Sequence, residues 1–109
     1  MSTPGKLRNK RGGHRSQATK LMTNLYELLE SEASVNDIKT MSDELDNQLK
    51  AIIKLDEKIV DSLETEEEMT NELSSISEIT MKIKHCLNAV KNHISETHPN
   101  FVSRIDSLS

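Results

Sequence analysis

The strongest constraint on this chain is a pair of apolar heptad patterns that together run from Ser34 to Ile94 and are interrupted once, at Leu63-Glu64-Thr65. In each pattern, most seam positions are apolar and recur at alternating steps of three and four, the spacing of two helices that pack along a seam. The seam positions are Ile38, Met41, Leu45, Gln48, Ile52, Leu55 and Ile59, then Met69, Leu73, Ile76, Thr80, Ile83, Leu87, Val90 and Ile94. Because the two patterns have similar lengths and a very short connection, they predict an antiparallel helical hairpin.

Composition favours the same fold class. The 109 residues allow one small domain, only 2% of them are aromatic, and neither Gly nor Pro occurs between Arg15 and His98. Such a chain has little bulk for a rounded core around a cleft, but it can form packed helices. We therefore expect an all-α, coiled-coil-like fold.

Capping signals divide the expected domain into three helices, over about 14–31, 34–63 and 66–97. Ser34 with Asp37 and Thr65 with Glu68 have the spacing of helix N-caps. The first helix is short and carries one apolar stripe, so we expect it to pack on the hairpin in a three-helix arrangement. Pro99 should end the third helix, leaving 98–109 as a short tail with room for one more helical turn.

Charge is divided unevenly along the chain. The net charge is −4, yet all six Lys and Arg residues before Glu27 occur without a single acid. Residues 1–13 also contain Pro and three Gly, so we expect a disordered basic arm there. An arm of this kind is one candidate for nucleic-acid binding. Its basic residues are Lys6, Arg8, Lys10, Arg11, Arg15 and Lys20.

Catalytic and cofactor motifs are not found in the sequence. Cys86 and His93 do not have a common zinc-ligand spacing, and Gly12-Gly13 is not part of a phosphate-binding loop. Cys86 lies within a long helical pattern without glycines that would give access to it, and nothing in the sequence marks a lowered thiol pKa. We therefore expect no enzyme, no metal or other cofactor, and no small-molecule substrate.

Two sets of residues depart from the seam and suggest where function lies. Ile53 and Val60 on one predicted helix, and Ile79 and Cys86 on the other, form extra apolar stripes at intervals of seven. We expect these four residues to bind another copy of the chain or another helical protein. Gln48 and Thr80 are the polar positions of the seam, each about 16 residues from the turn. They predict a polar pair that sets the register of the hairpin, with solvated positions as the alternative.

Part of the chain resembles a known family. Arg11, Gly12, Arg15, Thr19 and Lys20 open the first helical pattern, and Lys54, Leu55, Asp56, Glu57 and Ile59 lie in the second. These elements resemble the N-terminal region of Gag-like polyproteins of BEL/Pao-type retroelements. The resemblance implies a non-enzymatic module that associates with itself or with a partner.

The sequence therefore predicts a helical oligomerisation or protein-interaction module, with nucleic-acid binding by residues 6–20 as the alternative. The single Cys86 excludes an internal disulfide, and no apolar run is long enough to cross a bilayer. We expect an intracellular protein, cytoplasmic or nuclear, that does not bind membranes.

Overall fold

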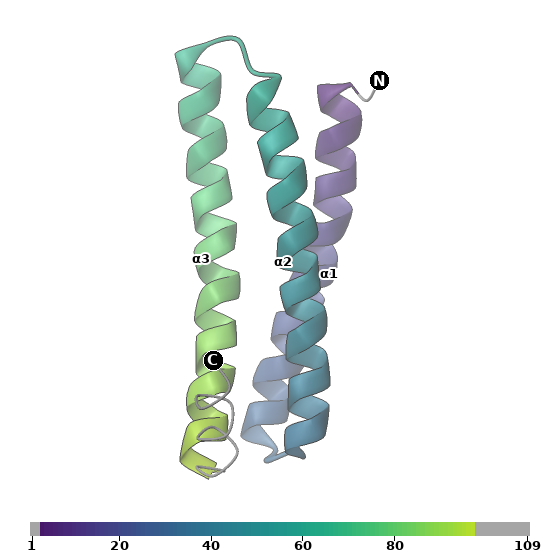
Figure 1. Ribbon diagram of the computed structural model, residues 1–109, viewed down its shortest axis with the longest axis vertical. Helices are drawn as coiled ribbons and strands as arrows, with labels where there is room; N and C mark the ends of the chain where they lie inside the picture. The colour runs from purple at the N-terminus through teal and green to yellow at the C-terminus, as the bar shows by residue number, and fades with distance from the viewer. Residues whose placement is uncertain (1–2, 98–109) are drawn as a thin grey trace, which may run out of the picture.

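The computed structural model describes residues 3–97, and they form three helices joined by short links (Figure 1). The helices are α1 (Pro4–Glu30), α2 (Val35–Asp61) and α3 (Glu66–Thr97). Each runs antiparallel to the one before it, so α1 and α3 point the same way (Figure 1). The prediction of an all-α, three-helix arrangement is confirmed. The expected tail over 98–109 lies outside the described residues.

The first helix is longer than predicted. It begins at Pro4, where the expected disordered arm should have been, and at 27 residues it equals α2. Thr3 caps it by accepting a hydrogen bond from the backbone N–H of Lys6 at 3.2 Å, and Pro4 occupies a first-turn position that suits proline. The expectation of disorder over 1–13 is therefore wrong for residues 4–13.

The two links follow the predicted capping signals. Ser34 accepts from the backbone N–H of Asp37 at 3.2 Å, and Thr65 accepts from that of Glu68 at 3.1 Å. The carboxylate of Glu68 in turn accepts from the backbone N–H of Glu64, one residue earlier than a standard capping box would place it. In the α1–α2 link, Glu32 has a φ of 55°, which turns the chain back along α1.

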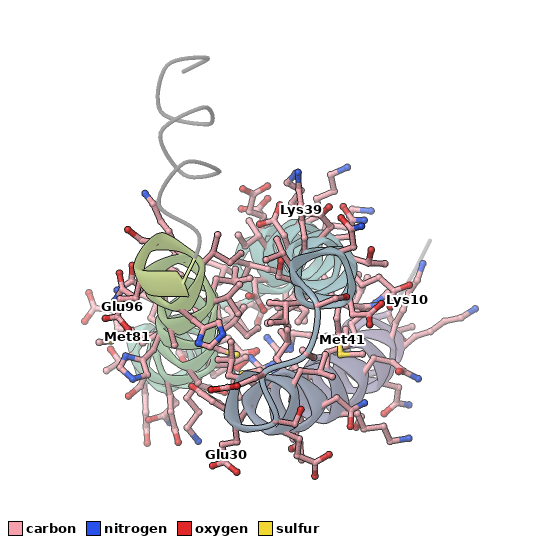
Figure 2. The ribbon with its side chains drawn as sticks, turned by 90° about the horizontal axis from the view of Figure 1, so that it is seen from below. Lys10, Glu30, Lys39, Met41, Met81 and Glu96 are labelled. Atoms are coloured by element: carbon pink, nitrogen blue, oxygen red, sulfur yellow. The ribbon has the colours of Figure 1, made fainter. Side chains whose placement is uncertain are left out.

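The core consists of a large and a small apolar group. The large one fills the end of the bundle near the α1–α2 link and its middle; its buried members are Ala18, Leu25, Ile38, Leu45, Leu49, Ile52, Ile83, Cys86, Val90 and Ile94. The small one, Leu7, Leu55 and Ile59, lies near the α2–α3 link. Seen along the bundle, Lys10, Glu30, Lys39, Met81 and Glu96 project outward while Met41 lies between helices (Figure 2).

The predicted seam is accurate on α2 and partly wrong on α3. Ile38, Leu45, Ile52, Leu55 and Ile59 are all buried, as expected. On α3, the predicted seam residues Met69 and Leu73 are exposed, whereas Glu72 and Cys86 are buried. In the first half of α3 the difference arises because this helix packs on α1 as well as on α2, which turns a different face inward. In its second half, the predicted seam residues Ile83, Val90 and Ile94 are buried, with Cys86 beside them.

Candidate functional site

A buried ionic cluster lies near the α2–α3 link and joins all three helices. Nη1 of Arg11 on α1 lies 2.9 Å from Oδ1 of Asp56 on α2 and 2.7 Å from Oε1 of Glu72 on α3. All three residues are buried. Because a charge in the interior is costly unless it is paired, this cluster fixes how the three helices meet.

Two further arginines extend the cluster. Nη2 of Arg15 lies 3.8 Å from Oδ1 of Asp56, and its Nη1 donates to Oγ of Ser75 at 3.1 Å. Nε of Arg8 lies 3.8 Å from Oε1 of Glu72, at the exposed edge of the cluster. Thus three arginines, spaced by three and four residues on one face of α1, meet carboxylates from both other helices.

Burial dominates the titration behaviour within this cluster. It raises the pKa of Asp56 above its ordinary value, an effect opposed by the hydrogen bond and charge of Arg11 and by the charge of Arg15. Burial, followed by the positive charge of Arg11, lowers the pKa of Arg15. Oδ2 of Asp56 has no hydrogen-bond partner among residues 3–97.

The predicted polar pair is not joined directly. Oε1 of Gln48 lies 2.7 Å from Nδ1 of His14 on α1, within hydrogen-bond distance. Thr80 is half-buried on α3, and no hydrogen bond within the described helices connects it to Gln48. The role of the pair in setting register stays a prediction, but the contact observed for Gln48 is with the first helix.

An apolar hollow opens on the surface between α2 and α3, on the same half of the bundle as the ionic cluster. It has a volume of about 500 Å³, and its lining residues are Ile53, Asp56, Glu57, Val60, Asp61, Leu73 and Ile76. Leu73 is 50% exposed and Ile53 is 38% exposed, while Val60 and Ile76 are half-buried. We refer to this set of lining residues as the α2/α3 groove.

The position of the groove follows from which face of α2 is buried against the other helices. Ile53 and Val60 are seven residues apart and so share a face of α2 beside the buried one. The buried face of α2 meets the other helices through Ile52, Leu55 and Ile59. The apolar stripe next to it therefore stays uncovered.

The structure separates the four residues predicted to bind a partner. Ile53 and Val60 lie in the groove, as a partner site would require. Cys86 is fully buried in the core, so the prediction that it binds a partner is wrong. Ile79 is half-buried, packs against that core and does not line the groove, and its binding role stays a prediction. Burial also raises the pKa of the Cys86 thiol. Leu73 and Ile76 complete the site; sequence reasoning assigned them to the seam.

The six basic residues of the alternative site are also divided. Arg11 is buried in ion pairs and Arg15 is partly buried beside it, whereas Lys6, Arg8, Lys10 and Lys20 are exposed. Sequence reasoning missed the ionic cluster because arginine was not counted as an inward-facing residue. The available signal was spacing: Leu7, Arg11 and Ala18 fall on one stripe of α1.

Neither a metal-ion site nor a membrane-spanning helix is found among residues 3–97. No group of three or more His, Cys, Asp or Glu side chains there is arranged to hold a metal ion. Among the same residues, none of the helices combines the length and the hydrophobicity required to span a bilayer.

Comparison with known proteins gives no further guide. Neither protein-family models, nor curated proteins, nor solved structures include a match to this chain.

Proposed function

We propose that this chain is a non-enzymatic helical protein-interaction module, and that the α2/α3 groove receives a helix of a partner chain. The observation that carries the proposal is the exposure of Leu73 and Ile53 on two different helices around one hollow. Covering large apolar side chains grouped in this way removes them from water, which favours binding of a partner.

The dimensions of the groove suit a helix. Its α2 wall runs from Ile53 to Asp61, roughly 12 Å at 1.5 Å per residue, and its other wall is another helix. A ligand helix lying between α2 and α3 would pack as a fourth helix and insert apolar side chains at i, i+3 or i+4, and i+7. Two or three turns of such a helix cover the hollow.

The resemblance to retroelement Gag-like proteins supports the same class of function, since it implies self-association or partner binding. A Gag-like origin is part of this proposal and does not add any site residue to it. Self-association and binding of a different protein are both consistent with a groove that takes a helix.

Nucleic-acid binding has less support. The buried pairing of Arg11 removes the central charge of the basic segment, and Arg15 is partly buried. The four exposed basic residues lie on a rigid helix in place of a flexible arm. If this alternative holds, the affinity of the native protein for RNA should fall steeply as salt is raised. Charge reversal of Lys6, Lys10 and Lys20 together should then abolish RNA binding.

The proposal is tested by selecting helical peptides against the protein from a displayed library of amphipathic sequences. We expect enriched peptides to lose binding to Leu73→Glu and to keep binding to Met81→Glu. Met81 is the matched control because it is an exposed apolar residue of the same helix outside the groove. Circular dichroism checks that both variants fold. Two results together would contradict the proposal. They are that no enriched peptide distinguishes the two variants, and that light scattering shows a strictly monomeric protein.

A further inference from the structure

We infer that the occupant of the α2/α3 groove is a cationic amphipathic helix of a different protein, with basic side chains placed over Asp56, Glu57 and Asp61. This inference rests on the proposed function and adds the chemistry of the partner.

The charge of the groove is of one sign. Its ionisable lining residues, Asp56, Glu57 and Asp61, are all acidic, and no Lys or Arg lines it. Asp56 is already paired with Arg11, so Glu57 and Asp61 supply the charge that a partner meets. Glu57 and Asp61 are four residues apart on α2, where two like charges lie close on the same helix face and repel each other. A basic side chain between them removes that repulsion and adds attraction.

One of the residues that line the groove, Asp56, has an acceptor without a hydrogen-bond partner among residues 3–97. Asp56 is 4% exposed; its Oδ1 accepts a hydrogen bond from Arg11, whereas its Oδ2 is buried and has no hydrogen-bond partner within residues 3–97. Because a buried acceptor without a partner is unfavourable, a donor that reaches Oδ2 from the groove after a small rearrangement of the surrounding side chains would be stabilised. Arginine suits it best, since the side chain is long and its guanidinium presents five N–H donors.

The same features disfavour a second copy of this chain. Two copies packed groove to groove would bring two sets of these carboxylates together, which is unfavourable. The basic face of α1 from another copy would supply charge, but its exposed residues from Lys6 to Lys20 include no large apolar side chain to fill the hollow. The occupant must carry both kinds of residue on one helix.

The test uses three fluorescent peptides of about 18 residues, long enough to form several helical turns. They share one leucine stripe at helical spacing and carry Arg, Gln or Glu at the same flanking positions. Affinity is measured by fluorescence anisotropy against the full chain. We expect the Arg peptide to bind at least about tenfold more tightly than the Gln peptide at low salt, and the Glu peptide to bind most weakly. The advantage of the Arg peptide should shrink as salt is raised.

A matched pair of charge variants locates the effect. Glu57→Lys with Asp61→Lys should abolish the preference for Arg, and Asp43→Lys with Glu44→Lys should retain it. Both double variants change the net charge equally, and Asp43 and Glu44 are exposed on α2 away from the groove. Equal loss in the two double variants would show nonspecific attraction and overturn the inference.

The outcomes separate this inference from the proposed function. If the Gln peptide binds as tightly as the Arg peptide and both are lost with Leu73→Glu, the groove binds helices but the cationic partner is wrong. If no peptide is affected by Leu73→Glu, both fail. If the protein is a dimer that Leu73→Glu dissociates, the occupant is a second copy and the inference is overturned.

Discussion

Nη1 of Arg11 donates a hydrogen bond to Oδ1 of Asp56 at 2.9 Å, between residues that are 45 positions apart in the chain and buried in the same layer. Glu72 approaches the same nitrogen from the third helix. This contact holds the N-terminal half of α1 against α2 and α3. It lies in the same half of the bundle as the groove, which Asp56 also lines.

Replacing Arg11 with Met should therefore strongly destabilise the protein. It leaves two buried carboxylates without their closest cation, a change that costs roughly 3–5 kcal/mol in buried pairs. Arg8→Met is the control, since Arg8 is a partly exposed member of the cluster and its loss should cost about 1 kcal/mol or less. Urea unfolding followed by circular dichroism gives both values. Equal effects of the two substitutions would show that the buried contact does not hold α1.

The raised pKa of Asp56 predicts an unusual pH dependence. Because the folded chain binds this proton more tightly than the unfolded chain does, the contribution of Asp56 to stability is complete below its unfolded pKa and is lost as pH rises through its folded pKa. The difference in unfolding free energy between the native protein and Asp56→Asn should fall over that interval and then become constant. Urea titrations from pH 3 to pH 7 measure it, at intervals of about half a unit. A difference that grows with pH would mean that pairing with Arg11 outweighs burial.

Gly12 and Gly13 lie inside α1, and a Cβ added at either position meets nothing within 4 Å. Replacing each with Ala should therefore stabilise the protein by roughly 0.5–1 kcal/mol, because Gly loses more backbone freedom on folding. Gly5→Ala is the comparison, since Gly5 lies in the first turn and should give a smaller gain. Thermal unfolding measures all three. An unchanged stability at both Gly12 and Gly13 would indicate that this part of α1 is not helical in solution.

The contact between His14 and Gln48 gives a test of which polar pair is coupled. A double-mutant cycle with His14→Ala and Gln48→Leu should give a coupling of roughly 0.5–1.5 kcal/mol, the usual value of a hydrogen bond. The cycle with Gln48→Leu and Thr80→Leu should give a coupling near zero, because no hydrogen bond joins that pair within the described helices. The reverse result would restore the register-setting pair predicted from the sequence.

The hairpin was predictable because apolar spacing and caps act locally. The seam from Ile38 to Ile59 and the caps at Ser34 and Thr65 can be identified without knowing where α1 packs. The path of α1 was not predictable in the same way. Arg11 turns inward only because Asp56 and Glu72 come from distant parts of the chain, and a glycine pair in a basic segment normally argues against a helix.

The groove was half predictable for a related reason. The extra stripe of Ile53 and Val60 is visible at an interval of seven, and both residues line the hollow. The α3 side was misassigned because periodicity alone does not show which of two neighbouring faces is buried. Glu72, drawn inward by Arg11, fixes that rotation and leaves Leu73 at the surface.

Methyl NMR of the full chain, titrated with a selected helical peptide, tests the central proposal most directly. We expect the methyl signals of Ile53, Val60, Leu73 and Ile76 to shift together and saturate, while those of Leu25 and Val90 in the distant core stay unchanged. Shifts confined to residues near Lys6, Lys10 and Lys20, or no saturable shift in the four groove residues, would contradict it.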